Sequence, residues 1–175
     1  MIDISKVVIG TWPLSGDLGK VNKKEVYNTL EYCIKIGFKE FDTAPNYGNG
    51  TMEKMIGDVF QGEKNIIINT KCGNNIDNKK DFGIQALQSS FYDSLERLCT
   101  NSVGTLFLHN PRQELKSLIP ILEFFQKEKL NGNIINSGIS LAKDYYYNPN
   151  ELKCFDASQN DLNLLYLKPI INDDL

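Results

Sequence analysis

The chain has 175 residues, of which 41% are apolar and 23% charged, and its formal net charge is −3. This size and composition are typical of one globular domain with its own core, so we expect a single domain over residues 1–175. The acidic balance argues against a nucleic-acid partner, and no apolar stretch has the length of a membrane span. The four cysteines form no CxxC pair and the N-terminus has no signal-peptide pattern, which favours a reduced, cytoplasmic protein without a metal site.

Six short apolar runs predict β-strands. They are rich in β-branched and aromatic residues and nearly continuous in apolarity, as in the buried strands of a parallel sheet. The runs cover residues 6–10, 38–43, 65–71, 103–109, 132–140 and 154–159.

Amphipathic helices are expected between these strands. Asn22 and Glu25 resemble a capping box at the start of one helix, which Gly37 ends. Two further helices show apolar residues at helical spacing. These residues are Leu87, Phe91, Leu95 and Leu98 in the first, and Leu118, Ile121, Leu122 and Phe125 in the second. A strand about every 30 residues leaves two architectures open, the doubly wound sheet and the (β/α)8 barrel.

Two glycine-containing segments partly resemble phosphate-binding loops. "GNGTME" at 48–53 has Glu53 where a dinucleotide fingerprint needs its third glycine. "GDLGK" at 16–20 lacks the spacing and the Ser/Thr of a P-loop. We expect both segments to form turns.

Four polar side chains stand at or just beyond the ends of consecutive predicted strands: Asp42, Tyr47, Lys71 and His109, the only histidine. In a parallel barrel these ends share the face that carries active sites. A tyrosine pKa of about 10 is too high for easy proton donation, but a nearby ammonium lowers it. Asp42 would keep Lys71 charged, and His109 could orient a substrate oxygen. Taken singly, these residues have plainer explanations: a turn cap, a solvated lysine and a structural histidine. Their joint placement at the ends of successive strands is what favours the functional interpretation.

Several motifs resemble the aldo-keto reductase superfamily and occur in its order along essentially the whole chain. They are "GTWPLSG" (10–16), "FDTAPNYGNGTMEKMIG" (41–57), "NTKCG" (69–73), "DSLERL" (93–98) and "LFLHNP" (106–111), followed by "GIS" (138–140) and "DASQNDLNLL" (156–165). The resemblance implies a TIM (β/α)8-type barrel, incomplete here with about six βα units. It also implies NADPH or NADH bound in extended form without a Rossmann fingerprint.

The same resemblance implies roles for individual residues. Tyr47 would be the general acid, Lys71 and Asp42 its tuners, and His109 the residue that orients the carbonyl. The cofactor would lie against Gly10, Thr11, Trp12 and Asp42, with Ser140 and Gln159 on the nicotinamide carboxamide and Tyr166 stacked on the ring. Leu141 follows Ser140 where many members have asparagine, which removes one amide contact.

The chain supplies six strands, whereas a complete barrel has eight and about 250 residues. By resemblance, the loops for the pyrophosphate and the adenosine 2′-phosphate are missing. Three explanations stay open: a fragment, a short form that self-associates through exposed sheet edges, or a non-catalytic member. If the chain ends at Leu175, we expect association or aggregation.

The pattern favours an oxidoreductase that reduces an aldehyde or ketone to an alcohol with NAD(P)H and has no nucleic-acid or membrane partner. The alternative is a non-catalytic cofactor-binding or regulatory member, or a fragment of the same fold. An isomerase or lyase is disfavoured because the chain has no phosphate-binding signature or metal-ligand cluster.

Overall fold

The computed structural model describes residues 3–63, 65–111, 117–141 and 149–160. Strands and helices alternate along these residues, and two short 3-10 helices lie near the N-terminus. The strands are β1 (Val8–Gly10), β2 (Glu40–Asp42), β3 (Ile67–Cys72), β4 (Val103–His109), β5 (Ile134–Leu141) and β6 (Ala157–Asn160). The helices are η1 (Ile4–Lys6), η2 (Trp12–Leu14), α1 (Lys23–Lys35), α2 (Thr51–Phe60), α3 (Ile84–Arg97), α4 (Ile119–Leu130) and α5 (Pro149–Leu152).

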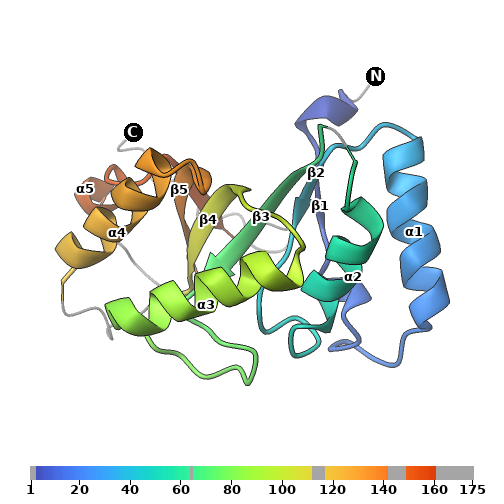
Figure 1. Ribbon diagram of the computed structural model, residues 1–175, viewed down its shortest axis with the longest axis horizontal. Helices are drawn as coiled ribbons and strands as arrows, with labels where there is room; N and C mark the ends of the chain where they lie inside the picture. The colour runs from blue at the N-terminus through green and yellow to red at the C-terminus, as the bar shows by residue number, and fades with distance from the viewer. Residues whose placement is uncertain (1–2, 64, 112–116, 142–148, 161–175) are drawn as a thin grey trace.

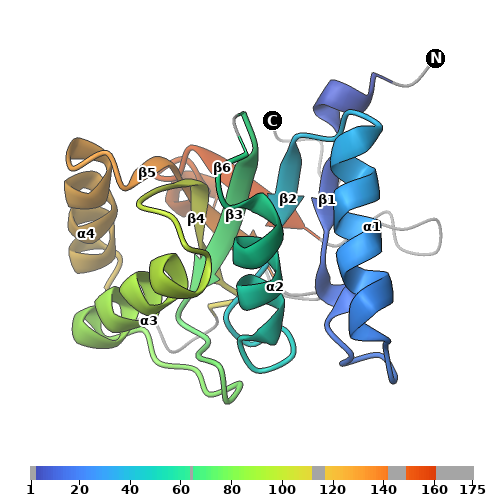
Figure 2. The same cartoon turned by 45° about the vertical axis from the view of Figure 1, so that its right-hand side comes forward.

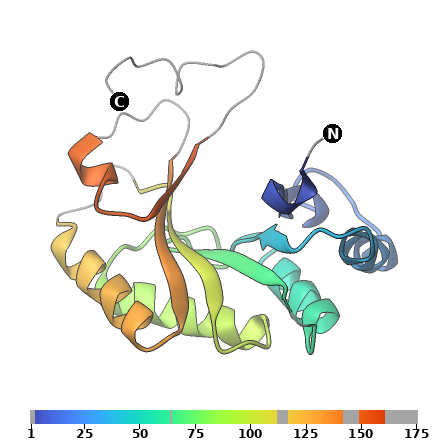
Figure 3. The ribbon, with the colours of Figure 1, turned by 90° about the horizontal axis from the view of Figure 1, so that it is seen from above.

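The six strands form one parallel sheet in the order β1-β2-β3-β4-β5-β6. A doubly wound sheet reverses its strand order at a switch point, and this sheet does not. It curls into part of a barrel, with α1 to α4 along its outer side (Figures 2 and 3). The fold is therefore an incomplete TIM-type barrel, as the resemblance implied.

All six predicted strands are confirmed, with ends that differ by at most three residues and with β4 matching at both ends. Strands β1 and β6 form the two edges of the described sheet. The expected self-association through these edges stays a prediction. Among the described helices, none combines the length and the apolarity needed to cross a bilayer.

Helix α1 shows why the predicted boundaries hold. The Asn22 side chain accepts a hydrogen bond from the Lys24 N–H and caps the first turn. At the other end, Gly37 adopts a φ of +102°, and the Phe38 N–H donates to the Cys33 carbonyl. This is a Schellman termination, in which glycine takes up the left-handed conformation at low cost.

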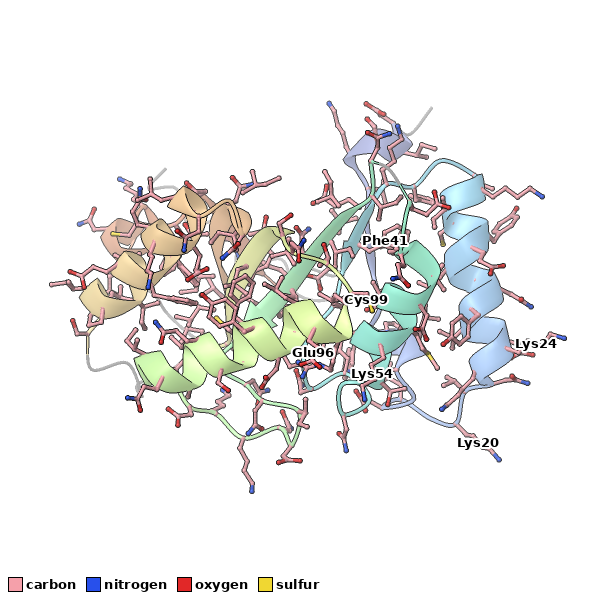
Figure 4. All side chains as sticks on the ribbon, in the orientation of Figure 1. Lys20, Lys24, Phe41, Lys54, Glu96 and Cys99 are labelled. Atoms are coloured by element: carbon pink, nitrogen blue, oxygen red, sulfur yellow. The ribbon has the colours of Figure 1, made fainter. Side chains whose placement is uncertain are left out.

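The core lies between the sheet and the helices. Both predicted apolar stripes contribute buried side chains, such as Leu87 and Phe125, while Leu95, Leu118 and Leu122 are partly buried against the same cluster. Helix α1 adds Leu30. In Figure 4, Phe41 of β2 points into this layer, whereas Lys24 of α1 points outward. Burial of this continuous apolar layer is the main driving force for the fold.

Glu53 has a structural role that its place in "GNGTME" did not reveal. It lies fully buried on α2, where its carboxylate accepts hydrogen bonds from Thr70 Oγ1 of β3 (2.6 Å) and Arg97 Nε of α3 (2.7 Å). Arg97 Nη2 also donates to Ser94 Oγ (3.0 Å). The turn expected over 48–53 is confirmed for residues 48–50, whereas Thr51 already begins α2. "GDLGK" lies in a turn, as expected.

Candidate active site

The loops that follow β1, β2 and β3 gather at one end of the sheet, at the lower edge of Figure 1. Thr11 joins the ends of β1 and β2, because its N–H and its Oγ1 both donate to the Asp42 carbonyl at 2.9 Å. Gly48 lets the loop after β2 approach the loop after β1, because a Cβ at Gly48 would lie 2.6 Å from the Ser15 carbonyl oxygen. This contact helps to fix the turn that carries Tyr47.

Asp42, Lys71 and Tyr47 meet at the carboxyl end of the sheet, which is called the mouth below. Lys71 Nζ lies 2.6 Å from Asp42 Oδ2 and 2.8 Å from the Thr43 carbonyl oxygen, to which it donates. It also lies 3.3 Å from the Tyr47 hydroxyl. Lys71 is only 1% exposed, so its charge is partnered as a buried ammonium requires. The tyrosine hydroxyl therefore adjoins a fixed positive charge.

His109 ends β4 beside this group. Its ring centroid lies 6.3 Å from that of Tyr47, edge to face. Burial, with the nearby charges of Lys71 and Lys80, lowers the pKa of His109 to about 3. The imidazole is therefore neutral near pH 7, and its Nδ1 is buried without a hydrogen-bond partner among the described residues. A neutral imidazole offers one donor and one acceptor.

The residues expected around a cofactor surround the same mouth. The Trp12 ring centroid lies 6.5 Å from that of Tyr47 and its side chain is partly exposed, while Gly10 ends β1 with open space at its Cβ position. His109 is opposite Ser140 in the sheet, and Ser140 is opposite Gln159. Tyr166 lies outside the described residues.

Three further residues lie at this mouth but were not predicted from the sequence. Thr43 contributes only its backbone carbonyl, so the identity of its side chain could not mark it as a site residue. Lys80 Nζ donates to the Asn110 carbonyl (2.9 Å), and a loop lysine of this kind also gave no signal. Asn110 directly follows His109 at a strand end, a position that could have singled it out.

The side chains around this mouth determine which metal or cofactor it could bind. Among the described residues, no three His, Cys, Asp or Glu side chains are grouped so that they could hold a metal ion. Ser140 of β5 is instead opposite His109, and Gln159 of β6 is opposite Ser140, at the same end of the sheet as the paired rings of Trp12 and Tyr47. Such a set fits a planar ring that carries a carboxamide, as in nicotinamide.

A parallel half-barrel that carries a lysine beside a tyrosine hydroxyl at its carboxyl end defines the chain as an α/β-barrel protein. The chain belongs to the aldo/keto reductase family, whose model matches residues 6–171.

Similar proteins support this assignment. An L-galactose dehydrogenase of Arabidopsis thaliana is 29% identical over 136 residues, which cover 73% of this chain and 42% of the relative. The uncharacterized oxidoreductase YqkF of Bacillus subtilis is 28% identical over 170 residues, or 94% of this chain and 52% of YqkF. The solved structure of a glycerol dehydrogenase from Gluconobacter oxydans has a TM-score of 0.75 at 22% identity and covers 91% of this chain and 52% of that one. The chain thus spans about half the length of the proteins it matches.

Proposed function

We propose that this protein is an NAD(P)H-dependent oxidoreductase that reduces an aldehyde or ketone to an alcohol. The observation that carries the proposal is the contact of Lys71 Nζ with both Asp42 and the Tyr47 hydroxyl, beside a neutral His109. Membership of the aldo/keto reductase family and similarity to several dehydrogenases support it.

In this proposal Tyr47 is the general acid. As hydride adds to the carbonyl carbon, negative charge develops on the oxygen, and the Tyr47 hydroxyl donates its proton there. The Lys71 ammonium, 3.3 Å from that hydroxyl, stabilises the phenolate that remains. Asp42 holds the ammonium in place and balances its charge. His109 orients the carbonyl oxygen through its single ring N–H.

Nicotinamide, when bound, supplies the hydride. Gly10, Thr11, Trp12 and Asp42 would flank it, and Ser140 and Gln159 would bind its carboxamide. These residues lie within the last two positions of β1, β2, β5 and β6 or just after β1, so the sheet itself sets their spacing. Sites built on strand ends hold a ring more precisely than sites on free loops do.

The test is carbonyl-dependent oxidation of NADPH and NADH by the wild type, Tyr47→Phe and Tyr32→Phe. Hydroxyaldehydes and hydroxyketones are the first carbonyls to assay, because a glycerol dehydrogenase is among the similar proteins. Aldoses are assayed with NAD(P)+ in the oxidative direction, because an L-galactose dehydrogenase is also among them. We expect Tyr47→Phe to lower the rate by about 10²- to 10⁴-fold. Tyr32 lies exposed on α1 and serves as the matched control.

Equal rates in the wild type and Tyr47→Phe would reject Tyr47 as the acid. Cofactor binding by the wild type without turnover of any carbonyl would instead favour the alternative, a non-catalytic cofactor-binding protein.

A further inference from the structure

Asn110 is held in an unusual backbone conformation at the end of β4. Its φ is +48°, in the left-handed region that asparagine tolerates better than most residues. Two backbone contacts fix it there: its N–H donates to the Ser140 carbonyl (2.9 Å), and its own carbonyl accepts from Lys80 Nζ (2.9 Å). The side chain is therefore presented from an anchored backbone, immediately after His109.

The Asn110 side chain also fixes the hydrogen-bonding state of Ser140. Ser140 Oγ donates to Asn110 Oδ1 at 3.2 Å, which commits the only hydroxyl proton. Ser140 Oγ is left as an acceptor. Asn110 Nδ2 keeps two N–H donors that have no partner among the described residues. One donor group and one acceptor thus stand side by side next to His109.

A primary carboxamide has the complementary pair, a carbonyl oxygen that accepts and an NH2 that donates. In nicotinamide this group lies one ring atom from the carbon that gives up hydride. Groups that hold the carboxamide must therefore lie close to the residues that hold the substrate carbonyl, and His109 and Ser140 are paired in the sheet.

We propose that Asn110 is a cofactor-binding residue of this protein: its Nδ2 donates to the nicotinamide carbonyl, while Ser140 Oγ accepts from the nicotinamide NH2. This inference rests on the proposed function. It also explains how the site works with Leu141 after Ser140. The Leu141 side chain packs against the hydrophobic core and offers no polar group. The amide comes instead from Asn110, the residue that follows β4.

The experiment compares binding of two oxidised cofactors, NAD(P)+ and its 3-acetylpyridine analogue, in which a methyl group replaces the NH2. Quenching of Trp12, the only tryptophan, reports binding without any need for turnover. The variants are Asn110→Gly, which keeps the left-handed backbone at no steric cost, and Ser140→Ala, with Asn101→Ala as control. Asn101 is exposed and precedes the opposite end of β4. Thermal melts confirm that each variant folds.

Asn110→Gly should weaken both cofactors by about 2- to 12-fold in Kd, because the carbonyl that it contacts is present in both. Ser140→Ala should weaken only the natural cofactor. The isosteric Asn110→Asp should also weaken both, because it replaces the donor with an acceptor.

Asn110→Gly binding within twofold of the wild type would overturn this inference, as would an equal loss of both cofactors in Ser140→Ala. The proposed function would survive either result if Tyr47→Phe still abolished turnover. A wild type that binds neither NADP+ nor NAD+ would overturn both.

Discussion

Two regions of this molecule each contain a buried ion pair. At the mouth of the sheet, Lys71 Nζ lies 2.6 Å from Asp42 Oδ2. In the layer between the sheet and the helices, Arg97 Nε lies 2.7 Å from Glu53 Oε2. Both carboxylates are almost completely buried, so burial and distance alone do not distinguish the two pairs.

The surroundings of the two pairs do distinguish them. Both Glu53 oxygens accept hydrogen bonds, and Arg97 also contacts Ser94, so the pair is enclosed within a network that joins α2, β3 and α3. Asp42 Oδ1 has no partner among the described residues, and Lys71 reaches the hydroxyl of a partly exposed tyrosine. A saturated network holds layers together, whereas a partly saturated one keeps hydrogen-bonding capacity for a ligand.

The largest expected effect is a loss of activity when the ion pair at the mouth is broken. Lys71→Met removes the charge beside the Tyr47 hydroxyl, and we expect kcat/KM to fall by about 10²- to 10⁴-fold. The measurement is steady-state reduction of the best carbonyl substrate, with Lys54→Met as control because Lys54 is an exposed lysine of α2. Comparable activity of the two variants would show that the mouth pair is structural, like the Glu53–Arg97 pair.

The second prediction measures how much the enclosed Glu53–Arg97 pair contributes to stability. Arg97→Met leaves the Glu53 carboxylate buried without its cation, and the free energy of unfolding should fall by about 3–5 kcal/mol. Urea denaturation measures it, and Glu96→Gln, which removes an exposed charge from the neighbouring position, is the control. A loss below about 1 kcal/mol would mean that water reaches Glu53 and that the network is not saturated.

The mouth of the sheet was easier to foresee than the layer behind it. The carboxyl ends of parallel strands lie at one edge, so Asp42, Lys71 and His109 could be grouped once the strands were recognised, and the resemblance added the roles. The Glu53–Arg97 pair joins residues 44 positions apart on two helices. Nothing in the local pattern of either helix predicts the partner, because helix packing decides which buried side chains meet.

Backbone contacts were also beyond prediction. The Thr43 carbonyl that binds Lys71 and the Asn110 carbonyl that binds Lys80 belong to groups that every residue carries. Side-chain chemistry therefore cannot mark them in a sequence. The loop after β3 has to fold before Lys80 can reach the end of β4, and its path depends on turns that no hydrophobic period specifies.

The third prediction concerns pH and the mouth of the sheet. The pKa of His109 is about 3 in the folded protein and 6.5 when unperturbed. Between these values the unfolded chain binds the extra proton, so the free energy of unfolding rises with pH. This contribution is complete above about pH 6.5 and is lost as the pH falls toward 3. We expect Tm of the wild type to decline from pH 6.5 to 4, and that of His109→Gln to decline less.

Asp156 is a second group whose pKa is lowered by folding, but it titrates outside the pH range of this measurement. Burial raises its pKa, but the hydrogen bonds from Lys129 and Ser137 outweigh burial and lower the pKa to about 2. Its unperturbed value is 3.8, so its contribution is lost only below about pH 4. The window from pH 6.5 to 4 therefore isolates His109 from this carboxylate. Equal slopes of Tm against pH in the wild type and His109→Gln would show that folding does not lower the pKa of His109.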